Sequence, residues 1–272
     1  MRLAVSSSVA LACILHAFAA AAAPPCRDDR PGDGAPARVP VQGPADLGVP
    51  QEACARTALY LEGRGALLVA TDEFYGSILT GLSMRGTAAL PWLGSWVSLY
   101  VPGLEARYVA NATVDRWKVS LGGGAVGGHV PLGEVGPVTV VGFARALLPT
   151  ETVFVNARRY GVEPGVSARW VPTPTLEVLG GLASTSTWTV VPGRARYVFD
   201  PVISADAVYR PFRAGALVAG VSVRPLESVD WRAQMRLYPY RELSLSMGVA
   251  VPSLGRDRTD AATSLSLGWD GL

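Results

Sequence analysis

The feature that most constrains this chain is an alternation of apolar and small or polar side chains, clearest in residues 243–251, LSLSMGVAV. Because successive side chains of a strand point to opposite sides, a period of two predicts a β-strand with one apolar face. Similar alternation recurs at 104–112, 115–122, 138–147, 197–210, 215–224, 229–238 and 262–272. The chain is therefore predicted to be all-β, and the open question is what the apolar faces contact.

Composition favours lipid as the answer. Hydrophobic residues make up 49% of the chain and charged residues only 17%, whereas about 25% is usual in soluble domains. Beyond the first two dozen residues no apolar run reaches the roughly 18 residues that a spanning helix needs. A β-barrel is the other structure that satisfies its backbone in hydrocarbon. Alanine and glycine are also frequent on the apolar faces, and they would fill the core of a soluble sandwich poorly.

The N-terminus predicts export. Arg2 precedes an apolar stretch that ends in small residues, which is typical of a secretory signal peptide over 1–22. Residues 23–55 are rich in proline and glycine and are expected to form a periplasmic tail, while 56–272 form the barrel. Cys26 and Cys54 remain after cleavage, and such a pair in an exported chain favours a disulfide, which would stabilise by about 3 kcal/mol. Two unpaired thiols are the alternative.

Short connections divide the strands. YPYRE, YRPFR, WVPTPT, LLPTE and ATVDR are interpreted as tight turns at every second connection, with VPSLGRDRTD, VPGRAR and GGHVPLGEVG between them. This alternation is typical of membrane barrels, which have short turns at one end. The spacing predicts a transmembrane antiparallel up-and-down β-barrel of about 14 strands, with 12 possible. Aromatic residues near the short turns are expected to lie at the membrane boundary: Trp170, Tyr209, Phe212, Tyr238 and Tyr240.

The chain resembles bacterial outer-membrane β-barrels of the porin type in four features. These are the predicted signal peptide (the leader), the alternating strands, the proline-marked turns and the final strand at the end of the chain. The resemblance covers 57–272 and is architectural. It implies an outer-membrane location, two periplasmic termini, contact with outer-membrane lipid and insertion by the barrel-assembly machinery. The chain departs from the pattern at its last residues, GWDGL, because such proteins usually end on an aromatic residue.

Charged residues on the opposite faces are expected to line the lumen. The basic ones are Arg64, Arg107, Arg116, Lys118, Arg145, Arg158, Arg169, Arg210, Arg224, Arg232 and Arg236, and the acidic ones are Glu62, Glu105, Glu177, Asp206 and Asp230. Because basic residues exceed acidic ones about two to one and such rings favour anions, we expect a narrow passive channel for small polar or anionic solutes. In the alternative, ion pairs between neighbouring strands close the lumen and the barrel is a structural anchor. In a variant of this hypothesis, the proline-rich tail folds into the barrel and plugs the lumen.

Enzymatic function is not expected. His129 is the single histidine after the leader, and its glycine-rich surroundings, GGGAVGGHVP, are interpreted as a solvated loop without a nucleophile. A lipid hydrolase is therefore the least favoured alternative. No phosphate-binding loop, metal-spaced cluster or basic run for nucleic acid is present, so no cofactor, metal or nucleic-acid partner is expected.

Overall fold

The computed structural model describes thirteen strands and the residues next to some of them. The described residues are 58–70, 75–90, 95–110, 115–121, 123–150, 158–191, 193–212, 214–225, 228–240, 243–255 and 261–271. In β1–β4 many residues are described by their backbone only. The predicted leader, the tail, Cys26 and Cys54 lie outside the described residues.

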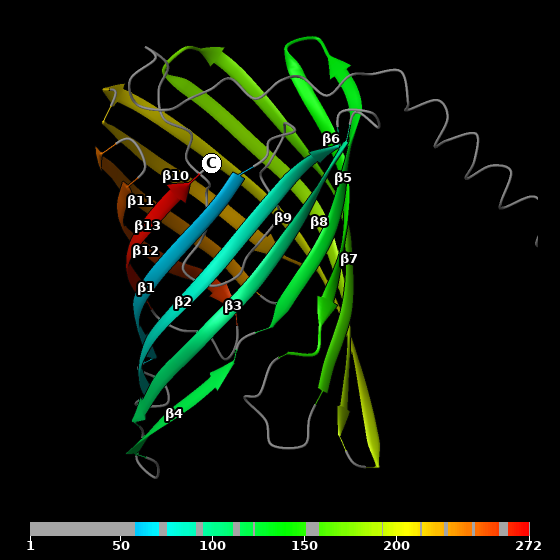
Figure 1. The fold of residues 1–272 in the computed structure, drawn as a ribbon, viewed down its shortest axis with the longest axis vertical. Coiled ribbons are helices and arrows are strands. Elements are labelled where there is room, and N and C mark those ends of the chain that lie inside the picture. The colour runs from blue at the N-terminus through cyan, green and yellow to red at the C-terminus, as the bar shows by residue number, and fades with distance from the viewer. Residues whose placement is uncertain are drawn as a thin grey trace, which may run out of the picture.

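The strands follow one another without helices in the described part of the chain (Figure 1). They are β1 (Ala58–Ala70), β2 (Tyr75–Leu90), β3 (Ser95–Ala110), β4 (Asp115–Leu121), β5 (Gly124–Val135), β6 (Val138–Leu148), β7 (Arg158–Thr173), β8 (Leu176–Val191), β9 (Arg194–Phe212), β10 (Gly215–Arg224), β11 (Ser228–Tyr240), β12 (Leu243–Gly255) and β13 (Ala261–Gly271).

All pairings are antiparallel, and from β5 to β13 each strand pairs with the next one in the chain. β1 pairs with both β2 and β13, and β3 pairs with β2 on one side and with β4 and β5 on the other. The pairing therefore runs round the wall. Beside β4 it is incomplete, because β4 pairs only with β3 among the described residues. The predicted antiparallel up-and-down architecture is confirmed.

β4 and β5 occupy one place in this wall. Both pair with β3 in the same register, β4 along 104–110 and β5 along 96–100, so they continue one another. The thirteen described strands thus fill twelve places, where about fourteen strands were expected and twelve were possible. The glycine-rich stretch expected as a loop is largely β5, because alternating glycine and bulkier residues still give a two-sided strand.

The turns at one end of the barrel are short. Tyr240 pairs with Leu243 across one of them, and Thr173 pairs with Leu176 across another. β1 and β13 meet at the same end, since Leu59 is the register partner of Gly271. We call this the turn end; the C-terminus marks it in Figure 1. LLPTE and ATVDR follow β6 and β3 at the opposite end, so their predicted place in the short series was wrong. LLPTE and WVPTPT lie on either side of β7, so they are consecutive connections and not every second one.

The apolar faces of the strands are exposed on the outside of the wall. In β12 and β13 the exposed side chains include Met247, Val249, Leu265 and Leu267, whereas Ser244, Ser246 and Ser266 are buried. Exposed aromatic side chains form two belts. Trp170, Tyr209, Phe212, Tyr240 and Trp269 lie towards the turn end, and Tyr160, Trp188, Tyr197, Phe199 and Trp231 lie towards the opposite end.

The distance between the belts matches a bilayer. On β9, Tyr197 and Tyr209 are separated by roughly 40 Å of strand at about 3.3 Å per residue. A strand tilt near 45° reduces this to about 28 Å along the barrel axis, close to the apolar band of outer-membrane barrels. Tyr238 does not belong to the belt as predicted. It packs inside the barrel on the cluster Leu179, Val208, Ala216 and Val218. No described helix is long and apolar enough to span a membrane.

Ile203 tests the lipid-facing assignment. It lies midway between the two belts of β9 and its side chain is 50% exposed. We expect Ile203→Arg to lower the free energy of unfolding in lipid vesicles by about 2–4 kcal/mol, because the guanidinium would lie at the bilayer centre. The matched variant Phe212→Arg, in the turn-end belt, should cost only about 0–1 kcal/mol. Denaturant titration in vesicles measures both, and equal costs would contradict the assignment.

Candidate functional site

Charged side chains on the buried, inner face of the wall form ion pairs between strands. Arg232 of β11 donates from Nε to Asp206 Oδ1 on β9 at 2.6 Å, and its terminal nitrogen also bonds Asp206 Oδ2. The two strands are not neighbours, since β10 lies between them, and Gly220 is the register partner of both residues. A side chain at Gly220 would overlap Asp206 Oδ1. Glycine at this position is therefore what lets the pair form across β10.

A second cluster lies near the turn end. Glu177, at the start of β8, accepts from Arg169 Nε at 2.6 Å and from the terminal nitrogen of Arg210 at 2.7 Å. Both Glu177 and Arg210 are buried. One carboxylate is shared by two guanidinium groups, so these three side chains together carry a net positive charge. Hydrogen-bonded partners of opposite sign offset part of the desolvation cost of a buried charge.

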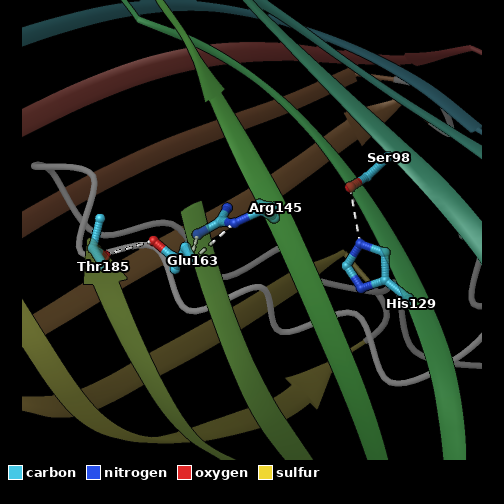
Figure 2. Close-up of polar contacts among 5 residues, drawn as sticks. All are labelled: Ser98, His129, Arg145, Glu163 and Thr185. Atoms are coloured by element: carbon cyan, nitrogen blue, oxygen red, sulfur yellow. Dashed lines mark hydrogen bonds and ion pairs between the residues drawn. The ribbon is translucent and has the colours of Figure 1, made fainter. Parts of the chain in front are cut away.

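A third group lies on β6, β7 and β8 (Figure 2). Arg145 Nε donates to Glu163 Oε1 at 3.0 Å, and Thr185 Oγ1 donates to Glu163 Oε2 at 3.0 Å. Arg145 and Glu163 are direct register partners. Asp200 of β9 is the register partner of Thr185 and forms an ion pair with Arg224, Nε to Oδ2, at 3.3 Å. These contacts link five neighbouring strands on the inner face.

His129 is not a solvated loop residue, which corrects the prediction. It lies in β5 with a side chain only 1% exposed, and it stacks on Trp96 with ring centroids 5.2 Å apart. Ser98 Oγ lies 2.8 Å from His129 Nε2, as Figure 2 shows. Alternation within one strand does not reveal this partner, because Ser98 belongs to a different strand, β3. Both residues face inward, away from the side that contacts lipid, so the pair gives no support to a lipid hydrolase.

The structure places most of the predicted lumen residues on the inner face. Arg145, Arg169, Asp206, Arg210, Asp230, Arg232 and Arg236 lie there. Arg107, Arg116 and Lys118 occupy β3 and β4, where these side chains are not among the described ones. Arg158 departs from the prediction: its register partner is Val190, which lies on the exposed apolar face. Arg158 and Arg169 lie on the same strand, β7, at positions of opposite parity, so the predicted orientation of Arg158 was wrong.

Glu163, Thr185 and Asp200 were missed as lumen residues. The sequence around Glu163 reads GVEPG, and proline beside glycine resembles a turn more than a strand. Asp200 precedes Pro201 in the same way. Alternation could have assigned Glu163, because it is two positions from Gly161 and four from Ser167, which lie on the inner face.

No known family model matches the sequence, and no curated protein matches it. Among solved structures, the COG4313 outer membrane channel from Pseudomonas putida F1 has a TM-score of 0.63 at 10% identity, over 85% of this chain and 100% of that chain. KdgM porin in complex with disordered oligogalacturonate has a TM-score of 0.47 at 11% identity, over 78% and 98%. NanC porin has 0.46 at 12% identity, over 78% and 98%. The first likeness shows the fold: this chain has the architecture of porin-like outer-membrane β-barrels.

Gly220 provides a test of the paired inner wall. We expect Gly220→Ala to lower the free energy of unfolding by about 1–3 kcal/mol, because the added methyl group must displace the Asp206–Arg232 pair. Gly180→Ala is the matched control, since its added atom would lie 3.8 Å from the nearest neighbour, and it should change stability by less than about 0.5 kcal/mol. Thermal or denaturant unfolding, followed by the gel mobility of unheated samples, measures both. Equal stability of the two variants would contradict the bridging role of Gly220.

Proposed function

We propose that this protein is a narrow passive channel of the bacterial outer membrane for small polar or anionic solutes. The observation that carries the proposal is the polarity of the wall, which is apolar and aromatic outside and charged inside. Such a wall suits a barrel that contacts lipid on one side and encloses water on the other. The wall has twelve places, more than the roughly eight strands whose interior side chains fill completely.

The location rests on three features. The fold is that of an outer-membrane channel. The two aromatic belts are spaced as the two boundaries of a bilayer. Short turns at one end, together with the ends of β1 and β13, support a periplasmic position for the turn end and for both termini. Contact with outer-membrane lipid and insertion by the barrel-assembly machinery belong to the same proposal.

A preference for anions rests on the cluster at the turn end. Arg169 and Arg210 share the single carboxylate of Glu177, and Arg236 lies on the same inner face. Excess positive charge on a pore wall attracts anions. The preference is expected to be mild, because the arginines at 145, 224 and 232 each have a carboxylate of their own.

A closed, structural barrel is the second candidate. It is favoured by the same ion pairs, since Asp206 with Arg232 and Arg145 with Glu163 tie neighbouring strands together on the inner face. Buried pairs of this kind contribute to a specific arrangement of strands without requiring solute passage. Conductance separates the two candidates.

Reconstitution into planar bilayers tests the channel. We expect discrete conductance steps and, under a potassium chloride gradient, a reversal potential that indicates anion preference. Arg210→Gln should lower the anion-to-cation permeability ratio by roughly a factor of two, since it removes the excess charge of the turn-end cluster. Arg158→Gln removes the same charge from the outer face and should leave the ratio unchanged.

Two outcomes would contradict this function. Cation preference in the unsubstituted protein would remove the role of the basic cluster. Absence of conductance from samples that show the mobility shift of a folded barrel would favour the closed structural barrel instead.

A further inference from the structure

We infer that the end of the barrel opposite the turn end carries a binding site for the phosphate groups of outer-leaflet lipid, resting on the periplasmic position proposed above for the turn end. The site comprises residues 158–160 of β7, 188–191 of β8 and 194–197 of β9, which we call the arginine tip. It adds a specific lipid contact to the proposed channel.

The arginine tip extends beyond the strands on either side of it. β9 pairs with β10 only from Ile203 onwards, so residues 194–202 have no partner on that side among the described strands. On the other flank β7 pairs with β6 only from Gly161 onwards, so residues 158–160 lack a described partner there. Figure 1 shows the hairpin of β8 and β9 reaching the bottom of the view. The tip is therefore open on both sides of the sheet and at both of its edges.

Four arginines gather on this tip, and all of them are exposed: Arg158, Arg159, Arg194 and Arg196. Thr189 of β8 is the register partner of both Arg159 and Arg196, so these two flank one strand and their backbones lie roughly 10 Å apart. Arg158 is the next residue of β7 and lies on the outer side, while Arg194 is the first residue of β9. Strand register thus brings four positive charges to one place.

No carboxylate balances these charges. Residues 158–162, 186–191 and 193–199 contain the four arginines and no aspartate or glutamate. None of the four forms an ion pair with the part of the chain that the structure describes, whereas the inner-face arginines at 145, 169, 210, 224 and 232 do. Like charges this close repel one another, and an anion bound among them reduces the repulsion. The tip arginines are thus available to a ligand.

Their depth in the membrane indicates which ligand. Tyr160, Trp188 and Tyr197 are register partners and form one row of the opposite-end belt, with the rings of Trp188 and Tyr197 5.4 Å apart. The arginines lie one to three residues beyond this row. At about 3.3 Å per residue and a tilt near 45°, they are at most about 7 Å further along the barrel axis. They therefore lie just outside the apolar band, at the level of lipid head groups.

A lipid phosphate fits this arrangement better than a dissolved anion does. The planar guanidinium group donates two parallel hydrogen bonds to a phosphate, and the exposed rings of the aromatic row can pack on the adjoining acyl chains. An anion in the lumen would not reach Arg158, which lies on the lipid side. Outer-leaflet lipid surrounds the tip, so it meets Arg158 directly and Arg159 and Arg196 over the two free edges. Lipopolysaccharide carries phosphates next to its acyl chains and is the lipid to test.

Binding is measured with the full exported chain in detergent and three probes: lipopolysaccharide, dephosphorylated lipopolysaccharide and inorganic phosphate. We expect lipopolysaccharide to bind in the presence of EDTA, because guanidinium groups bind phosphate without a bridging cation. The dephosphorylated form should bind about tenfold more weakly, the effect of one charge-assisted hydrogen bond. Inorganic phosphate at millimolar concentration should not displace the lipid, since it has no acyl chains for the aromatic row to contact.

Substitutions locate the site. Arg159→Gln and Arg196→Gln should each weaken lipopolysaccharide binding about tenfold, and Arg196→Lys should retain more affinity than Arg196→Gln because the charge remains. Val135→Glu, at an exposed position near the turn end, changes the net charge by the same amount and should leave the affinity unchanged. Gel mobility of unheated samples verifies that each variant is folded. Unchanged affinity in both glutamine variants, equal binding of the two lipopolysaccharides, or displacement by inorganic phosphate would overturn the site.

The leaflet is tested separately on intact cells. Pro149 is exposed and follows β6 at the same end as the tip, so Pro149→Cys should react with a membrane-impermeant maleimide, whereas the unsubstituted chain should not. Absence of labelling in the folded variant would overturn the outer-leaflet assignment together with the proposed orientation. Lipopolysaccharide binding by a protein that shows no conductance would support the site and contradict only the channel.

Discussion

The rest of the structure depends on the need to pair every backbone N–H and C=O group where water is absent. In hydrocarbon an unpaired backbone group costs several kcal/mol, so strands must pair on both sides. Apart from the edge beside β4, the described wall meets this need by pairing of strands close in the chain and by one distant pairing, between β1 and β13. Once that pairing forms, each strand has one face towards lipid and the other towards the lumen, and the alternation in the sequence becomes a difference between outside and inside.

The separation of an outer apolar face from an inner polar face determines which charged side chains contact one another. Side chains confined to the lumen cannot reach bulk water freely, so arginines and carboxylates meet each other instead. The resulting contacts cross strands: Asp206 reaches Arg232 over Gly220, and Glu177 is shared by residues of β7 and β9. Glycines have a specific part here, because Gly220 and Gly127 lie where a Cβ would collide with the charged side chains beside it. The wall is thus stabilised from within by polar contacts and from outside by contact of apolar side chains with lipid.

Sequence patterns predicted the outer face better than the inner one. Leu265, Leu267 and Met247 are exposed as the alternation indicates, and four of the five aromatic residues assigned to the turn-end belt lie there. Errors arose where glycine or proline weakened the pattern. β5 was interpreted as a loop because its small residues resemble a turn, and this misplaced His129. Arg158 was assigned to the same face as Arg169, although the two lie at positions of opposite parity on one strand, β7.

By itself the sequence determined the strand content, the apolar side of most strands and the excess of basic residues among the polar positions. Each of these is a local property, since it depends on neighbours two residues apart or on composition. Only the tertiary structure decided which charges meet, that Ser98 lies against His129, and that Arg145, Glu163, Thr185 and Asp200 share one row. These contacts depend on the register between strands. Register is set by turns, bulges and long-range pairing, and a shift of one residue moves every side chain to the other face.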